Sequence, residues 1–230
     1  MKIKVLGTRG EIDQSAPYHS KHSGILIDDI LLLDCGEESF LKYRPQLILI
    51  THLHPDHAFF VRSDEHPLIE CAIYAPEKYK NMDIAVKKKR WKWKDYTITP
   101  IPTIHSLKVL SNAYLIEHNN QKILYTGDLI WIEKKHHLLL SNLDLVITEA
   151  STIRRDGLVR RDKKSGKVFG HAGIPTLIAL FKKFTPTILF VHFGSWFYHD
   201  IKSGRKKLHQ ISKNHIPRVI IGYDGAEIAL

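Results

Sequence analysis

Residues 47–60 read LILITHLHPDHAFF, an apolar run followed by three histidines and an aspartate within six positions. The continuous apolar half is typical of a strand that is buried on both faces. Residues two apart in an extended segment point the same way, so His52 and His54 can present their imidazoles to one point. Asp56 and His57 lie beyond a turn and can face a neighbouring point. Imidazole with carboxylate is a ligand set for zinc and related divalent metals, and we expect all of these residues to bind metal.

Further candidate ligands stand at the ends of other predicted strands. They are His105 after TPIPTI, Asp128 after KILYTG and His192 after TILFV. A strand end holds a ligand on a rigid scaffold, which the geometry of a metal site requires. One metal does not need so many groups, whereas two adjacent metals do. We therefore expect two divalent ions, with zinc as the first choice and manganese or iron as alternatives.

The rest of the chain alternates between predicted strands and predicted helices. Strands are expected at 2–7, 24–28, 31–36, 46–51, 72–76, 96–106, 143–151, 186–194 and 218–230 (the last with an internal turn), and a hairpin at 112–128. Helices are expected at 56–63, 76–89, 174–184 and 202–215, and a long mobile loop at 152–170. Two sheets covered by outer helices form a four-layer α/β/β/α sandwich, so we predict an α/β fold in one domain spanning residues 1–230.

The composition sets the class of partner and the compartment that we expect. The formal net charge of +10 favours a phosphorylated or nucleic-acid-like substrate through long-range attraction. Cys35 and Cys71 are the only cysteines in the sequence and are too few for a disulfide framework, so we expect a reducing, cytoplasmic location. No stretch approaches the ~18 apolar residues of a membrane span, and no membrane partner is expected.

The motifs quoted so far resemble those of the metallo-β-lactamase superfamily, over essentially the whole chain. LLLDCG at 31–36 resembles the first motif, in which Asp34 is a buried orienting carboxylate, and THLHPDH at 51–57 resembles the signature motif. The later candidate ligands follow in the order that the superfamily has. The resemblance implies a metallo-β-lactamase fold with two ligand sets and a bridge: His52, His54 and His105 for one metal, Asp56, His57 and His192 for the other, and Asp128 between them.

The resemblance also implies a reaction. Two metals about 3.5–4 Å apart can hold a bridging hydroxide at neutral pH and stabilise a phosphoryl oxygen or an oxyanion. Asp56 can ligate a metal and also accept the hydrogen bond of that hydroxide. The implied enzyme is a hydrolase without a covalent protein intermediate. Redox members of the superfamily usually carry Glu where His54 stands, and the main di-zinc β-lactamases carry Cys where Asp128 stands, so neither chemistry is expected.

Two later stretches, ITEAST at 147–152 and FGHAG at 169–173, resemble the tRNase Z and phosphodiesterase branch. In that branch a Glu and a His outside the metal shell cooperate, and the His protonates the leaving alkoxide. Glu149 and His171 occupy the corresponding places. Thr148 replaces the His that commonly precedes the Glu, and the long tRNA-gripping arm is missing. A small phosphodiesterase, resembling the one in phosphonate metabolism, therefore fits the chain better than a tRNA-processing enzyme.

The predicted loop at 152–170 lies between Glu149 and His171 and is rich in basic residues. Its arginines suit bidentate contact with phosphate, so we expect substrate binding from Arg154, Arg155, Arg160 and Arg161. The alternative is an ordinary solvated surface. Similarly, Trp91 and Trp93 in KKKRWKWK could form a nucleic-acid surface or pack inward, and we favour inward packing.

Taken together, these patterns favour a binuclear phosphodiesterase with Asp56, Glu149 and His171 as its catalytic residues. The alternative enzyme is a hydrolase of carboxylic esters, lactones or thioesters on the same site. A different class is a basic nucleic-acid-binding module with a single structural metal. A structural zinc site normally closes with four ligands, and this chain offers more candidates than that.

Overall fold

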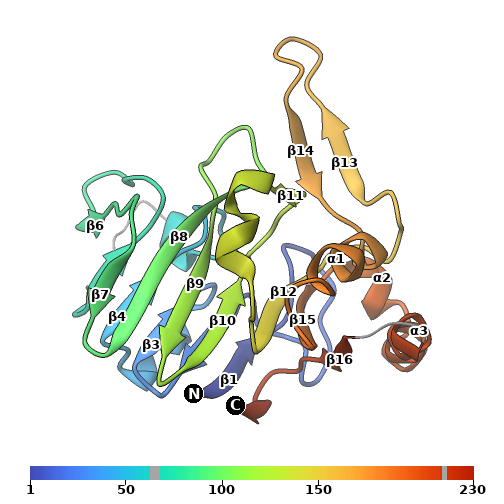
Figure 1. The fold of residues 1–230 in the computed structure, drawn as a ribbon, viewed down its shortest axis with the longest axis horizontal. Helices are drawn as coiled ribbons and strands as arrows, with labels where there is room; N and C mark the ends of the chain where they lie inside the picture. The colour runs from blue at the N-terminus through green and yellow to red at the C-terminus, as the bar shows by residue number, and fades with distance from the viewer. Residues whose placement is uncertain (63–67, 214–216) are drawn as a thin grey trace.

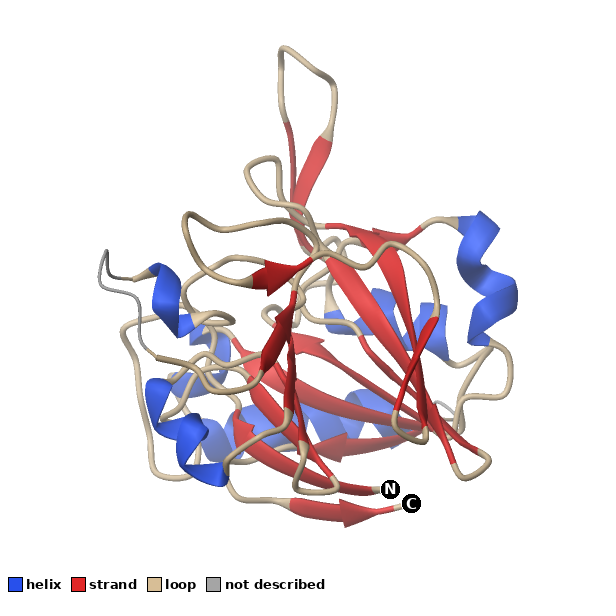
Figure 2. Cartoon of the chain, turned by 90° about the vertical axis from the view of Figure 1, so that its left-hand side faces the viewer, coloured by secondary structure: helices blue, strands red, loops and turns tan. Residues whose placement is uncertain are grey.

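The structure, a computed structural model, describes residues 1–62, 68–213 and 217–230. Two sheets face one another, and helices cover both outer faces (Figure 1, Figure 2). The first sheet has the strand order β17-β1-β2-β3-β4-β5-β6, with the bounds β1 Lys2–Gly7, β2 Gly24–Ile27, β3 Leu31–Leu33, β4 Leu47–Leu49, β5 Ala72–Tyr74, β6 Ile84–Ala85 and β17 Glu227–Ala229. Strands β3, β4, β5 and β6 run parallel, and the others pair antiparallel.

The second sheet has the order β11-β8-β9-β10-β12-β15-β16, with β7 paired to β8 beside β11. Its strands are β7 Trp91–Trp93, β8 Tyr96–Ile104, β9 Asn112–His118, β10 Gln121–Tyr125, β11 Trp131–Ile132, β12 Leu145–Ala150, β15 Thr187–Phe193 and β16 Arg218–Ile221. Strands β10, β12, β15 and β16 are parallel to one another. The carboxyl ends of β10, β12 and β15 therefore meet at one edge of the sheet.

Helices and 3-10 turns complete the outer layers. They are α1 Ile174–Phe181, α2 Ser195–Tyr198, α3 Ile201–Lys213, η1 Glu38–Tyr43, η2 Phe59–Val61 and η3 Lys134–Leu140. Phe40 of η1 and Phe60 of η2 are buried on the outer face of the first sheet, whereas α1 and α3 cover the second sheet. This arrangement confirms the predicted four-layer α/β/β/α sandwich. Within the described ranges, no helix has the length and apolar character needed to cross a bilayer.

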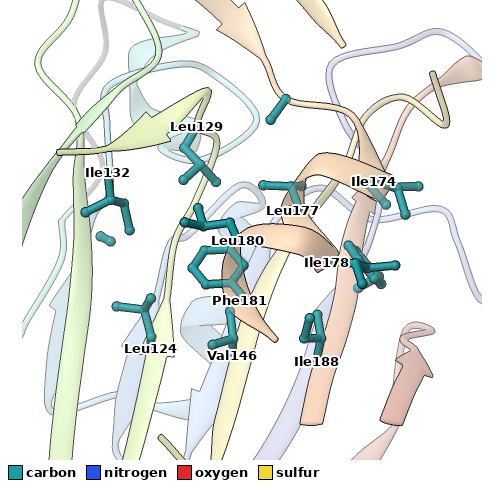
Figure 3. Packing of buried hydrophobic residues seen from close by; sticks show 14 of the residues in the cluster. Leu124, Leu129, Ile132, Val146, Ile174, Leu177, Ile178, Leu180, Phe181 and Ile188 are labelled. Carbon is teal, nitrogen blue, oxygen red and sulfur yellow. The ribbon is translucent and has the colours of Figure 1, made fainter. Parts of the chain in front are cut away.

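Alternating side chains on the central strands fill two separate cores. Ile123 of β10 points between the two sheets, while its neighbour Leu124 points outward beneath α1. Figure 3 shows this outer core, where Leu177 and Phe181 of α1 lie over Leu124 and Val146. Strands that are buried on both faces need apolar residues at every position, which explains the continuous apolar runs in the sequence.

Several local predictions are confirmed. The hairpin of β9 and β10 turns at Asn119 and Asn120, whose φ values of 48° and 60° are those of a type I′ turn. Pro100 and Pro102 lie on the stretch of β8 that neither β7 nor β11 covers, so the missing N–H groups cost no ladder hydrogen bonds. The indoles of Trp91 and Trp93 pack against the core between the sheets.

Two predicted helices are wrong. Residues 76–89 form no helix, because Ile84 pairs with Ile73 at the edge of the first sheet and is buried there. Tertiary pairing thus overrides the local helical preference of this segment. The helix expected at 56–63 is only the 3-10 turn Phe59–Val61, and residue 63 lies outside the described residues. The helix expected at 202–215 is confirmed as α3 as far as Lys213, and residues 214 and 215 are not described.

The prediction of a long loop at 152–170 is also wrong. The segment contains a two-stranded hairpin, β13 Leu158–Arg161 and β14 Val168–His171, which stands out from the body of the molecule (Figure 1). Its turn is held by Asp162, whose carboxylate accepts hydrogen bonds from the N–H and hydroxyl of Ser165, and by Gly166 with a φ of 69°. The hairpin brings its inner face to the functional site described next.

Candidate metal centre

The strand-end residues chosen from the sequence meet at one place, where the ends of both sheets come together. His52 follows β4, His105 follows β8, Asp128 follows β10, and His192 lies near the end of β15. Two sets of ligand atoms result, each within 4.8 Å of one another: His52, His54 and His105 in the first, and Asp56, His57, Asp128 and His192 in the second. The ring nitrogens His54 Nδ1 and His105 Nε2 are 3.3 Å apart.

Asp128 stands between the two sets and addresses each with a different oxygen. Its Oδ1 lies 3.4 Å from His57 Nε2 and 3.3 Å from His192 Nε2. Its Oδ2 lies 3.9 Å from His52 Nε2 and 3.8 Å from His105 Nε2. These separations are too long for good hydrogen bonds, yet they are ordinary between ligand atoms that surround a common cation.

Buried ligand atoms that lack a hydrogen-bond partner show whether metal ions fit this cluster. Among the described residues, His52 Nε2, His57 Nε2 and Asp128 Oδ1 are buried and have no hydrogen-bond partner. Leaving several buried polar atoms unsatisfied is costly, and native proteins avoid it. Imidazole nitrogen and carboxylate oxygen are the donors that zinc and similar divalent ions accept. The cluster therefore fits metal ions.

The pKa shifts of His52, His54 and Asp128 point the same way. Burial, together with the nearby His105, lowers the pKa of His54 to about 4, and burial holds the pKa of His52 well below its usual range. Burial alone would raise the pKa of Asp128, but His192 and His57 outweigh it and hold that pKa well below its ordinary value. Burial lowers the pKa of His57, but the carboxylates of Asp128 and Asp56 outweigh it and raise that pKa. Neutral His52 and His54 beside an ionised Asp128 are in the protonation states that metal ligands require.

A surrounding shell of hydrogen bonds aims the ligand nitrogens at the centre. Asp34, which is fully buried, places Oδ2 2.6 Å from His57 Nδ1, so His57 Nε2 faces the cluster. Thr51 and Tyr125 donate to the same carboxylate from its other sides. Asp34 is thus the orienting residue that the sequence resemblance implied. Gly127 has a φ of 54°, and a Cβ there would lie 2.5 Å from Thr51 Oγ1, so this turn beside Asp128 needs glycine.

Two further contacts in this shell could not be predicted from the sequence. His105 Nδ1 lies 2.9 Å from the carbonyl oxygen of Gly170, in the projecting hairpin. His192 Nδ1 lies 2.9 Å from the Oγ of Ser23, the residue that directly precedes β2. Neither Gly170 nor Ser23 belongs to a motif with metal-ligand spacing, so only the three-dimensional arrangement reveals them.

Replacing Asp34 with asparagine tests the orienting shell. We expect the Asp34→Asn variant to fold but to bind zinc roughly 10–100-fold more weakly, because an amide holds the His57 ring less firmly. Isothermal titration of chelator-treated protein with zinc measures the change. Asp144 offers a matched control, because its exposed carboxylate accepts a hydrogen bond from the Lys122 N–H and belongs to neither ligand set. Unchanged zinc affinity in Asp34→Asn, equal to that of Asp144→Asn, would remove the orienting role.

Glu149 and His171 lie next to the cluster and contact each other. Glu149 Oε2 is 2.8 Å from His171 Nδ1, and Glu149 Oε1 accepts a hydrogen bond from the Leu129 N–H. His171 Nδ1 is also 3.8 Å from Asp128 Oδ2, and His105, Asp128 and His171 form a third set of close ligand atoms. Burial lowers the pKa of His171, but the carboxylates of Glu149 and Asp128 outweigh it and raise that pKa to about 9.

A cavity of about 330 Å³ opens beside the cluster, and the hairpin forms one of its walls. Leu158 pairs with His171 and Arg160 pairs with Phe169, so all of these side chains share the face of the hairpin that lines the cavity. His54, His105 and Ser106 line it as well. The cavity thus leads from the hairpin directly to the candidate ligands.

The arginines chosen from the sequence separate in the structure. Arg160 lines the cavity, whereas Arg154 forms an exposed ion pair with Asp156, with Nη2 and Oδ2 2.6 Å apart. Arg161 projects from the opposite face of the hairpin and donates to the carbonyl oxygen of Gly166. Arg155 does not line the cavity, and its carbonyl oxygen accepts a hydrogen bond from Thr176. The structure therefore brings one of the four arginines to the site.

Comparison with known proteins gives structural likeness only. No protein-family model matches the sequence, and no curated protein sequence matches it significantly. The metallo-β-lactamase fold protein YhfI from Bacillus subtilis has 18% identity and a TM-score of 0.70, covering 99% of this chain and 98% of its own. The short form of human tRNase Z has 18% identity and a TM-score of 0.65, covering 100% and 99% of the two chains.

A diphosphatase from the PhnP family has 15% identity and a TM-score of 0.67, covering 100% of this chain and 97% of its own. These likenesses extend over whole chains, although the sequences have diverged widely. Together with the two sheets and their outer helices, they establish that this chain has the metallo-β-lactamase fold. The fold class predicted from the sequence is confirmed.

Proposed function

We propose that this chain, which has the metallo-β-lactamase fold, is a binuclear metal-dependent hydrolase that acts on phosphodiesters. The observation that carries the proposal is the contact between Glu149 and His171 at the edge of a buried cluster of candidate ligands. Cleavage of a phosphodiester expels an alkoxide, which is a poor leaving group and benefits most from a general acid. Among the similar structures, the names tRNase Z and diphosphatase also belong to enzymes of phosphate chemistry.

In this proposal two divalent ions, zinc by preference, occupy the two ligand sets. His52, His54 and His105 would hold one ion, Asp56, His57 and His192 would hold the other, and Asp128 lies between the two sets, where it would serve both. Bound there, the ions would lower the pKa of a water molecule and neutralise charge on the phosphoryl oxygens. The rest of the reaction depends on side chains that this chain supplies.

Asp56 and His171 have complementary roles in proton movement. Asp56 is buried, with Oδ2 3.7 Å from His57 Nε2 and 3.6 Å from His192 Nε2, and we assign it to orient the attacking water. His171 has its Nδ1 held by Glu149, which leaves Nε2 to protonate the departing oxygen. The Glu149 carboxylate stabilises the protonated ring, as the raised pKa of His171 requires.

Arg160 is the residue that we expect to bind substrate phosphate from the hairpin. We expect Arg160→Ala to raise KM for anionic diesters about tenfold, because a guanidinium beside the cavity contributes a charge-assisted hydrogen bond. It should also reduce the dependence of kcat/KM on salt. Arg161→Ala is the matched control, since this neighbour projects from the other face and should leave both quantities unchanged. If the two substitutions changed KM and the salt dependence equally, Arg160 would have no specific role, and the hairpin would be an ordinary basic surface.

A panel of chromogenic substrates tests the proposed reaction class. Zinc- or manganese-loaded protein is assayed with bis-p-nitrophenyl phosphate beside a p-nitrophenyl ester, a lactone and a thioester. We expect the phosphodiester to give the highest kcat/KM, with the activity lost on chelation. Preferential hydrolysis of the ester, lactone or thioester would contradict the proposed substrate class while leaving the metal centre in place.

A further inference from the structure

His192, the candidate ligand near the end of β15, stands at an irregularity of its strand. Glu149 of β12 pairs with Val191 and Ala150 pairs with Phe193, so His192 is the extra residue of a β-bulge. Its φ of 53° lies in the left-handed region, which is unfavourable for residues other than glycine. A bulge re-aims its side chain, and such a backbone persists only where the surroundings hold it. The groups that hold this bulge therefore determine where His192 points.

The loop at 8–23, which joins β1 to β2, pairs with the bulge and passes close to the ligand atom. The Phe193 N–H donates to the carbonyl oxygen of Thr8 at 2.7 Å, and the Gly10 N–H donates to the carbonyl oxygen of Phe193 at 3.1 Å. A Cβ at Gly10 would lie only 3.0 Å from His192 Nε2. The start of this loop is therefore built against the bulge.

Asp224, in the turn between β16 and β17, fastens the two ends of the loop together. Its Oδ1 accepts a hydrogen bond from the Thr8 hydroxyl at 2.8 Å, and its Oδ2 accepts from the N–H groups of Ser20 and Lys21 at 2.7 and 3.0 Å. These bonds join residues 203–216 positions apart in the sequence, so the carboxylate does not merely cap its own turn. Thr8 is fully buried, so bulk water cannot replace the carboxylate as its acceptor.

We propose that Asp224 is a positioning residue for the second ligand set and acts on His192 through Thr8. The carboxylate fixes Thr8, and Thr8 holds the bulge so that His192 Nε2 faces Asp128 Oδ1, 3.3 Å away. At the other end of the loop, Ser23 Oγ lies 2.9 Å from His192 Nδ1 and fixes the ring. The inference rests on the proposed binuclear centre but not on its substrate, because zinc binding is the quantity measured.

The test measures the affinity of chelator-treated protein for each zinc ion by isothermal titration. We expect Asp224→Ala to weaken the binding of one ion about 10–100-fold and to leave the other within about twofold. Thr8→Val removes the same link from its other end and should give the same pattern, whereas Thr8→Ser keeps the hydroxyl and should bind both ions as the wild type does. Asp28→Ala is the matched control, because the Asp28 carboxylate likewise accepts hydrogen bonds from a backbone N–H, of Lys2, and a hydroxyl, of Tyr96. It should leave both affinities unchanged.

Two further measurements separate positioning from general destabilisation. In a His192→Ala background, Asp224→Ala has no ligand left to position, so the double variant should bind its remaining ion as tightly as His192→Ala alone. Hydrogen exchange at the Phe193 and Gly10 amides of the metal-free protein reports on the bulge directly. We expect this exchange to become about tenfold faster in Asp224→Ala and to stay unchanged in Asp28→Ala.

Unchanged affinity for both ions in Asp224→Ala would overturn the positioning role. An equal weakening of both ions, or a further loss in the double variant, would overturn it as well, because either result indicates general destabilisation. One ion or none in the wild type would contradict the proposed binuclear centre, and amide exchange then decides for Asp224 alone. Faster exchange at Phe193 in Asp224→Ala would support the link to the bulge, and unchanged exchange would overturn it.

Discussion

Replacing Asp128 with alanine is expected to abolish turnover and to remove at least one metal ion. Asp128 is buried and is the residue whose two oxygens face both ligand sets, at 3.3–3.9 Å from four ring nitrogens. Its loss removes the carboxylate that the two sets share, so that Asp56 is the one anionic ligand left among them. We expect kcat/KM to fall by about a thousandfold or more, measured together with metal content by mass spectrometry.

Two further variants show whether the effect of Asp128→Ala comes from the lost charge at this position. Asp128→Asn keeps the shape of the side chain and should lose activity almost as fully, which separates lost charge from misfolding. Asp144→Ala removes an exposed carboxylate of the same sheet, one that caps the Lys122 N–H, and should keep both metals and full activity. Two bound ions and full activity in Asp128→Ala would remove the bridging assignment and, with it, the proposed centre.

Replacing His171 with alanine is expected to slow the chemical step of cleavage while leaving both metal ions bound. The ring is anchored by Glu149 at 2.8 Å and lines the cavity, where a leaving group would stand. A general acid contributes typically 10²–10⁴-fold when the leaving group is poor and little when it is already stable. His171→Ala should therefore slow the cleavage of an unactivated dinucleotide by about this factor. Hydrolysis of bis-p-nitrophenyl phosphate should fall only mildly.

The other outcomes of the His171 experiment assign different roles. His171 also stands 3.8 Å from Asp128, so loss of a metal ion would make it a ligand. Equal losses on both substrates with metals intact would indicate that it positions phosphate. Glu149→Gln is the companion variant, because it keeps the hydrogen bond but removes the charge that raises the pKa of His171. We expect it to shift the descending limb of the pH–rate profile on the dinucleotide to lower pH.

The positions of His52, Asp128 and His192 could be predicted because each stands near the end of a strand that is largely buried on both faces, β4, β10 or β15. Such strands appear in the sequence as apolar runs, and the ends of parallel strands meet at one edge of a sheet. The residues that orient the ligands were less predictable. Asp34 was inferred only through a family resemblance. Ser23, which contacts His192, lies 169 residues from it in the sequence.

The projecting hairpin was predicted to be a loop for a different reason. All residues of β13 are exposed, so the segment lacks the apolar alternation that reveals a half-buried strand. The signal was in the turn, where Asp162, Ser165 and Gly166 supply the hydrogen bonds and the positive φ that a hairpin needs. Once the strands are paired, alternation sends Arg160 into the cavity and Arg161 away from it, which no count of basic residues could show.

Residues 76–89 show how tertiary contacts override local preference. Their sequence favours a helix. Ile84 instead pairs with Ile73 at the edge of the first sheet, and the burial of its side chain there outweighs the local helical preference. The extended course that results places Lys87 and Lys88 beside a cavity that Pro100 and Pro102 of β8 also line. The course of this segment therefore depends on the same pairing that made the helix prediction wrong.

The proposed binuclear centre requires two metal ions per chain, one for each ligand set. Chelator-treated wild-type protein is saturated with zinc, freed of excess ion, and its metal content measured by inductively coupled plasma mass spectrometry. The expected result is two zinc ions per chain, with hydrolysis of bis-p-nitrophenyl phosphate restored as the second ion binds. One ion or none at saturating zinc would contradict a binuclear centre and leave a chain with at most a single metal.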